Sequence, residues 1–216
     1  MAISLLDDSV LCPPLSLDMM SPMKKLLAII VLSLCFMSLS QADDIRDFQI
    51  EGISIGDSVL DHSKIKNFQK FIPYKSKKYQ GGFKKINSDI YDSLQFFYIK
   101  KDKNKTLENI SGKKYFPNNI KECLKKKKKI ENEVSKLFPN LKKQIVEKAH
   151  GADPSKKSMI YALNFNFPEG HIIQVSCTDW EKYKDRNGKM RNDKDELKVQ
   201  LNKSSYVNFV RYEAWK

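Results

Sequence analysis

A long amphipathic helix, expected over residues 119–138, constrains the fold of this chain more than any other feature. At about 100° per residue, its apolar side chains fall within one contiguous arc, and Cys123 lies at the centre of that arc between Ile130 and Val134. The other members of the arc are Ile120, Leu124, Leu137 and Phe138. A helix with one apolar stripe must bury it against another layer, so the rest of the chain has to supply that layer.

The same helix explains the lysine run at residues 125–129. Only Lys127 intrudes on the apolar arc, where its stem can lie along the edge of the core while its ammonium reaches solvent. Glu122, Glu131 and Glu133 lie four positions from lysines of the run, which favours pairing along the helix. We therefore interpret the run first as a solvated helix face and second as a binding patch.

Alternating apolar and polar residues predict antiparallel strands elsewhere in the chain. The expected strands are 94–100 and 107–116, joined by a polar turn; 158–165 and 171–177, joined by a turn at Pro168; and a strand in which Leu197, Val199 and Leu201 alternate with Lys198, Gln200 and Asn202. A terminal helix is expected from Ser205. The predicted fold class is α+β: a mainly antiparallel sheet, the long helix (about 119–138) packed on a face, and a C-terminal helix.

Other segments have weaker patterns. We expect a short strand with a kink over 47–55, a helix over 57–72 capped by Asp57 or Ser58, a loop or frayed hairpin over 75–86, a polar link over 140–157 and a charged turn over 185–195.

Residues 23–42 (MKKLLAIIVLSLCFMSLSQA) have the pattern of a cleaved export signal. Lys24 and Lys25 precede an apolar run, and small residues follow it, so cleavage is expected after Ala42. The run is short for a bilayer-spanning helix, which needs about 20 apolar residues, although an uncleaved N-terminal anchor is the alternative. Leu34 is too large for the residue before a lipidated cysteine, so Cys35 is not expected to carry a lipid.

Residues 1–22 resemble neither a signal nor a folded element, and we interpret them as a gene-model extension. The expected product is a single mature α+β domain, residues 43–216, in the periplasm or secreted. Cys12 and Cys35 are removed together with the leader, so the mature chain keeps two cysteines, Cys123 and Cys177. An even pair in an exported chain predicts a disulfide, worth about 4 kcal/mol in the chain-entropy model. No second cysteine or histidine lies at ligand spacing from either, so no metal site is expected.

The net charge of +13 becomes +14 once the leader, with two basic and three acidic residues, is removed. Such a charge suits an anionic polymer or a membrane surface. Only four arginines are present and the chain is rich in Lys, Asn and Ile, which is typical of an AT-rich genome, so dedicated nucleic-acid binding is not expected. The best basic surface, with a mobile loop as the alternative interpretation, consists of Lys75, Lys77, Lys78, Tyr79, Phe83, Lys84 and Lys85.

Gly56-Asp57-Ser58 resembles the nucleophile block of GDSL-type lipases and esterases, which implies a secreted hydrolase with Ser58 as nucleophile. That family takes its base from a C-terminal Asp-x-x-His, which this chain lacks. Separately, His150, Asp153 and His171 could form a catalytic cluster in space, although nothing in their spacing requires it. Because a serine without a base is a weak nucleophile, we interpret the motif as a turn and helix cap, with no catalytic residue and no cofactor expected.

The IEGISIGDS opening, together with the leader, the Cys-bearing helix and the Cys-bearing strand, resembles small uncharacterised exported proteins of AT-rich alphaproteobacteria. The resemblance runs across most of the mature chain and implies export, but it transfers no function. The chain also has a weaker likeness to small envelope lipoproteins of the outer-membrane assembly type, but it lacks their lipidation motif. We therefore expect an exported binding or envelope-associated protein, with envelope proteins or anionic polymer as partners; the alternatives are the basic surface module and the Ser58 hydrolase.

Overall fold

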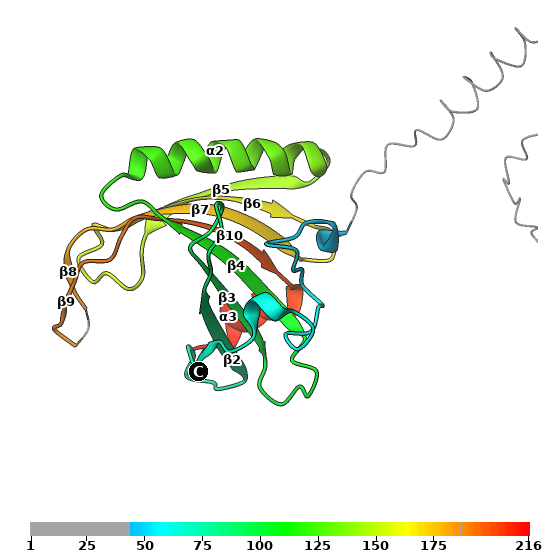
Figure 1. The fold of residues 1–216 in the computed structure, drawn as a ribbon. Coiled ribbons are helices and arrows are strands. Elements are labelled where there is room, and N and C mark those ends of the chain that lie inside the picture. Colours follow the sequence, from blue (N-terminus) through cyan, green and yellow to red (C-terminus); the bar gives the residue numbers. More distant parts are fainter. Residues whose placement is uncertain (1–43, 186) are drawn as a thin grey trace, which may run out of the picture. The chain divides into compact units, whose positions relative to one another are not determined.

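An antiparallel sheet of eight strands forms the centre of the computed structural model, which describes residues 44–185 and 187–216 (Figure 1). In spatial order the strands are β1 (Gln69–Phe71), β2 (Tyr79–Lys85), β3 (Ser93–Ile99), β4 (Leu107–Tyr115), β10 (Glu196–Asn202), β7 (Ile172–Asp179), β6 (Met159–Asn166) and β5 (Lys142–Ala149). The predicted extension, the leader with its cleavage site, and Arg186 lie outside the described residues. The last strand, β10, pairs with β4 and β7 and so joins two meanders into one sheet.

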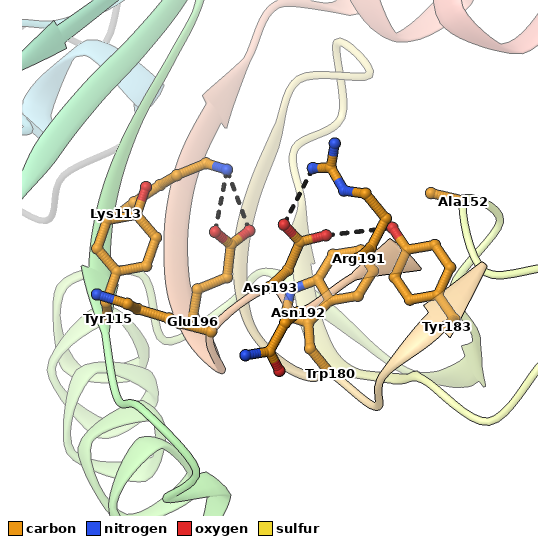
Figure 2. A pocket seen from close by; sticks show the side chains of 10 residues that line it. Lys113, Tyr115, Ala152, Trp180, Tyr183, Arg191, Asn192, Asp193 and Glu196 are labelled. Carbon is orange, nitrogen blue, oxygen red and sulfur yellow. Dashed lines mark hydrogen bonds and ion pairs between the residues drawn. The ribbon is translucent and has the colours of Figure 1, made fainter. Parts of the chain in front are cut away.

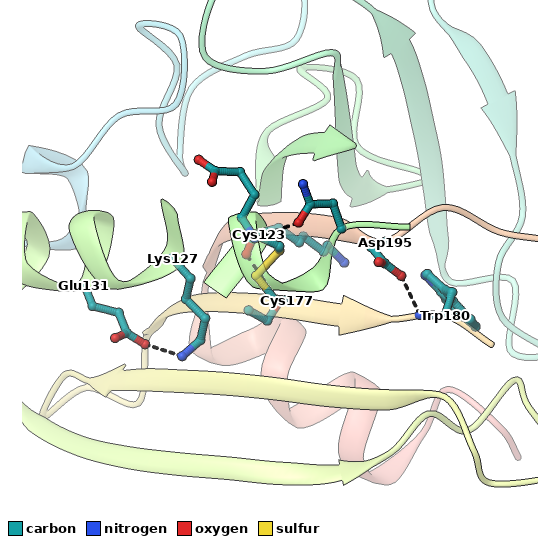
Figure 3. The surroundings of a disulfide bond; sticks show 10 residues. Cys123, Lys127, Glu131, Cys177, Trp180 and Asp195 are labelled. Atoms are coloured by element: carbon teal, nitrogen blue, oxygen red, sulfur yellow. Dashed lines mark hydrogen bonds and ion pairs between the residues drawn. A yellow bond between two sulfur atoms is a disulfide. The ribbon is translucent and has the colours of Figure 1, made fainter. Parts of the chain in front are cut away.

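The predicted long helix is confirmed as α2 (Ile120–Leu137), which packs against β7 and β10 on one face of the sheet (Figure 1). The Asn119 side chain caps it by accepting a hydrogen bond from the Glu122 backbone N–H at 3.2 Å. The predicted disulfide is also confirmed: Cys123 on α2 and Cys177 on β7 are bonded in the core (Figure 3). One turn farther on, Lys127 lies at the edge of the core and its ammonium pairs with Glu131.

The C-terminal helix, α3 (Ser204–Tyr212), packs on the opposite face of the sheet. Phe96 of β3 belongs to the core beneath α2, whereas its neighbour Phe97 packs with Tyr206 and Phe209 of α3. We call these two surfaces the α2 face and the open face. The α3 cluster occupies the open face over β2 to β4, and no other helix of the described residues packs on the open face of β10, β7 and β6. None of the helices within residues 44–185 and 187–216 is long and apolar enough to cross a membrane.

The strand predicted over 47–55 and the helix predicted over 57–72 are both wrong. The first segment has a 3-10 helix, η2 (Ile45–Asp47), and a tight turn at Glu51 and Gly52, both at positive φ. In the second segment, η3 (Ser63–Ile65) and β1 replace the helix. The backbone N–H groups of Gly56 and Val59 donate to the carbonyls of Leu107 and Lys105, so pairing with a distant loop replaces helical bonds.

Residues 44–65 nonetheless supply much of the core on the α2 face. Their buried side chains are Ile45, Ile50, Ile53, Ile55, Val59 and Ile65.

The loop or frayed hairpin predicted over 75–86 is also wrong, because β2 runs through Gly81 and Gly82 as one interior strand, paired with β1 and β3. Its paired glycines make room for aromatic rings. A Cβ on Gly81 would lie 2.6 Å from the Phe71 ring, and one on Gly82 would lie 2.3 Å from the Phe96 ring. The glycine pair that suggested a loop therefore serves close packing within a sheet.

The polar link predicted over 140–157 is wrong in part, because it contains the edge strand β5. The side chains of β5 are mostly exposed, so its sequence shows no apolar alternation. The charged turn contains a short hairpin, β8 (Tyr183–Lys184) with β9 (Met190–Arg191). The other predicted elements, namely β3, β4, β6, β7, β10 and α3, are confirmed.

Candidate functional site

The open face of the sheet carries a row of amide side chains that runs across several strands. The pairing register places Gln200 of β10 beside Gln174 of β7, and Gln174 beside Asn164 of β6. In the other direction Gln200 lies beside Ser111 of β4, which lies beside Gln95 of β3. We call these five residues the amide row.

Side-chain hydrogen bonds link three members of the amide row, Gln200, Gln174 and Asn164, into a chain with a direction. Gln200 Nε2 donates to Gln174 Oε1 at 3.0 Å, and Gln174 Nε2 donates to Asn164 Oδ1 at 2.7 Å. Within the described residues this leaves the Gln200 carbonyl oxygen as an acceptor and the Asn164 amide nitrogen as a donor without a protein partner. Asn164 is only 9% exposed, so its amide is held in place before anything binds.

A second polar pair lies beside the amide row toward α3. Asn109 Nδ2 donates to Asn202 Oδ1 at 2.7 Å and to the Leu201 carbonyl at 3.1 Å. The Asn109 side chain is 2% exposed, and its Oδ1 atom accepts no hydrogen bond from the described residues. A buried acceptor without a donor costs about 1–3 kcal/mol, so this asparagine is not explained by stability alone.

These polar residues, with the exception of Ser111, line a groove of about 610 Å³ on the open face. Tyr74, Tyr206 and Trp215 contribute aromatic surface to its lining, and Lys148 and Lys198 also line it. The Tyr74 and Tyr206 hydroxyls are 2.5 Å apart, and the Trp215 ring packs edge-on against Tyr74 with centroids 5.5 Å apart. We call this groove the open-face groove. Its volume is within the range of small-molecule sites, about 300–1,000 Å³.

Lys198 is one of three basic residues that line the open-face groove, together with Lys148 and Arg211. It lies beside Lys113 of β4 and Ser176 of β7, and no ion pair or hydrogen bond joins its ammonium to the described residues. Burial and, to a smaller extent, the neighbouring charge of Lys113 lower the pKa of Lys198 to about 8, against the opposing pull of Glu196.

A neighbouring pocket of about 530 Å³ has a different character (Figure 2). Its charged side chains pair with one another: Lys113 Nζ lies 3.1 Å from both Glu196 oxygens, and Arg191 lies 3.0 Å from Asp193. The Tyr183 hydroxyl donates to Asp193 at 3.2 Å. Because these groups satisfy one another, this pocket is a weaker candidate than the open-face groove.

No histidine or carboxylate of the described residues is hydrogen-bonded to Ser58. Its hydroxyl donates to the Asn104 carbonyl at 2.6 Å and accepts from the Leu60 N–H at 3.1 Å, so both partners belong to the backbone. The nearby His62 is bonded to Asp57 instead, at 3.0 Å. Ser58 therefore holds a turn and caps no α-helix.

The structure does not bring His150, Asp153 and His171 together. His150 and Asp153 lie beyond the Ala149 end of β5, beside Asp179, while His171 precedes the other end of β7 and accepts from the Ser204 N–H at 2.9 Å. The Asp153 carboxylate organises its own loop by accepting four hydrogen bonds from Ser155 and Ser158. Burial alone would raise the pKa of Asp153, but these bonds outweigh it and hold the pKa well below its usual range.

His150 packs on Trp180 with ring centroids 4.2 Å apart, and burial lowers its pKa. No group of three or more His, Cys, Asp or Glu side chains suited to a metal ion occurs in the described part of the chain.

The predicted basic surface is divided between solvent and core. Lys75, Lys77, Lys78 and Lys85 are exposed, Lys84 and Phe83 are partly buried, and Lys78 pairs with Glu213 at 3.0 Å. Tyr79 is 1% exposed and packs against Phe209 with centroids 4.5 Å apart. Its ring is therefore part of the core and has no free face for a ligand.

Sequence reasoning missed the amide row. The alternation of Lys198, Gln200 and Asn202 with leucine and valine was the available signal, but it gives only one strand's contribution. Comparison with protein-family models, curated proteins and solved structures finds no match for this chain.

Proposed function

We propose that this chain is an exported binding protein, periplasmic or secreted, that holds a small polar ligand in the open-face groove. The amide row carries the proposal. Solvent alone favours charged and hydroxyl side chains on an exposed strand face, whereas here neutral amides from neighbouring strands bond to one another and are partly or fully buried. Amides fixed in this way offer donors and acceptors at defined positions with little entropy left to lose on binding.

Two features support export. Residues 23–42 have the order of charges, apolar residues and small residues that export signals have. The disulfide between Cys123 and Cys177 is stable in an oxidising compartment such as the periplasm and is rare in the cytosol. Envelope proteins remain the proposed partners, and anionic polymer could bind the exposed lysines of residues 75–85 with an affinity that falls steeply with salt.

Intact mass spectrometry of protein recovered from the periplasmic and secreted fractions tests export. The expected product starts at Asp43 and takes up alkylating reagent at its two remaining cysteines only after reduction. A product that keeps the leader and has free thiols would refute export.

Binding can be followed through tryptophan fluorescence, since Trp180 and Trp215 both line pockets on this side of the sheet. We would titrate the protein with a panel of neutral sugars, sugar acids, amino acids and dicarboxylates and confirm any hit by calorimetry. At least one compound is expected to bind the wild type and to lose about tenfold or more in affinity with Gln174→Ala. Gln144→Ala is the matched control, because Gln144 continues the same row on the exposed edge strand but does not line the groove. Failure of every compound, or equal losses in both variants, would contradict the proposal.

A further inference from the structure

The charge around Lys198 indicates what kind of ligand the groove takes. The charged and titratable groups near Lys198 are Lys113 and Glu196 on β4 and β10, Lys148 and His150 at the end of β5, and Arg211 of α3 across the groove. Lys113 occupies both oxygens of Glu196 at 3.1 Å. Lys148, Lys198 and Arg211 are therefore left as positive charges lining the groove, which favours an anionic group on the ligand.

The position of Lys198 makes this a site rather than a charged surface. It belongs to the central strand β10, one residue pair away from Gln200 along the same face, so an anion on its ammonium would lie directly beside the amide row. A lysine next to another lysine across strands destabilises the sheet, so packing does not account for it.

The rest of the groove suits a molecule with many hydroxyl groups. A hydroxyl can donate to the Gln200 carbonyl oxygen and accept from the Asn164 amide, which are the two unpartnered ends of the hydrogen-bonded amides. Trp215 is 68% exposed and lines the groove, where an indole can cover the C–H face of a sugar ring.

We propose that the open-face groove binds an acidic saccharide, with the ligand carboxylate on Lys198 and its hydroxyl groups on the amide row. This inference rests on the proposed binding function and adds the chemical class of the ligand. Such a ligand should prefer the groove to the exposed lysines of α2 and of residues 75–85. Those lysines can attract any polyanion, but they offer no fixed amides beside the charge.

Proton linkage gives the proposal a second signature. An anion beside Lys198 favours the ammonium form, so affinity should be constant at neutral pH and fall as pH rises through about 8, where the free protein loses that proton. The limiting slope is tenfold per pH unit for one proton. A ligand held by the amides alone would bind with the same affinity across this range.

The test compares trigalacturonate with its carboxyl-reduced, neutral form, using tryptophan fluorescence at constant ionic strength. We expect the wild type to bind the acidic form at least tenfold more tightly. Lys198→Gln should remove this preference and the fall in affinity above pH 8, while Lys198→Arg should keep the preference and shift the fall out of the measured range. Lys125→Gln, on the solvent side of α2, removes the same charge far from the groove and should change neither.

Each other outcome contradicts a definite part of the proposal. Equal binding of the two forms, or a preference that survives Lys198→Gln, would refute the carboxylate contact. A preference that Lys125→Gln weakens as much would mean non-specific attraction to surface lysines. Binding of a simple dicarboxylate through Lys198, with neither oligomer bound, would refute the saccharide while leaving the binding function intact. If the wild type bound no compound of the wider panel either, the proposed function itself would fail.

Discussion

The two faces of β10 are built for different purposes. Leu197, Val199 and Leu201 point into a core that α2, the disulfide and residues 44–65 cover completely. Lys198, Gln200 and Asn202 point the other way into a groove that α3 covers only at one end. The α2 face therefore contributes stability through apolar burial, whereas the open face gives up some stability by partly burying amides and an unpaired lysine.

The largest expected effect comes from the disulfide on the α2 face. Replacing both cysteines by serine, Cys123→Ser with Cys177→Ser, should lower the free energy of unfolding by about 4 kcal/mol, because the bond spans 54 residues of sequence. Urea denaturation of the variant and the oxidised wild type measures this difference. A loss below about 1 kcal/mol would mean that the α2 face is held by packing alone.

The second effect isolates apolar burial on the same face. Leu201 is fully buried, so Leu201→Ala should cost about 3 kcal/mol through lost burial and the cavity it leaves. The midpoint of urea denaturation should fall without a large change in the slope of the transition. An unchanged midpoint would show that the core collapses freely around the missing side chain, and the contrast between the faces would then be weaker than we infer.

Most of the α2 face could be predicted from the sequence because its signals are local. The arc around Cys123, the alternation that ends at Cys177 and the leucines of β10 each follow from the geometry of a single element. The wrong predictions concern segments whose packing or hydrogen-bonding partners are remote in sequence. Residues 56–59 pair with 105–107, and Gly81 and Gly82 make room for Phe71 and Phe96, which no local pattern reveals.

The open face could be predicted only in part, for a related reason. Gln200 and Gln174 are visibly polar positions in predicted strands, but their contact depends on β10 lying between β4 and β7. Periodicity fixes which face a side chain takes and leaves open which strand lies next to it. The candidate residues from motifs, Ser58 and His150 among them, came from local resemblance and proved to hold turns or pack on neighbours.

The third prediction concerns the free energy of unfolding that the protein loses by placing Lys198 on the open face. Burial lowers its pKa to about 8, so between pH 8 and 10.5 the unfolded chain binds more protons than the folded chain and stability due to this group rises with pH. Lys198→Met should therefore stabilise the protein at pH 7 by roughly 2 kcal/mol, and this advantage should shrink as pH approaches 10.5. Urea denaturation at pH 7, 9 and 10 measures it.

The control for Lys198→Met is Lys125→Met on the solvent side of α2, where no such pH dependence is expected. Titration of other lysines and of tyrosines contributes equally to all three proteins, so only the difference between variant and wild type counts. If the two lysine variants followed the same curve, the ammonium of Lys198 would be fully solvated, and the cost of the open face would have to come from its amides.

The smallest effect on stability is expected at Gln200, next to Leu201 in sequence and opposite to it in direction. Gln200→Ala removes one hydrogen bond, to Gln174 Oε1, at a partly exposed position, so the free energy of unfolding should fall by less than about 1 kcal/mol. Affinity for any ligand of the groove should nevertheless fall about tenfold, since the free acceptor of the amide row is lost. Of these adjacent residues, Leu201 would then contribute mainly to stability on the α2 face and Gln200 mainly to binding on the open face. A Gln200→Ala variant as unstable as Leu201→Ala, with binding unchanged, would instead make the amide row part of the core and remove the functional argument for its polarity.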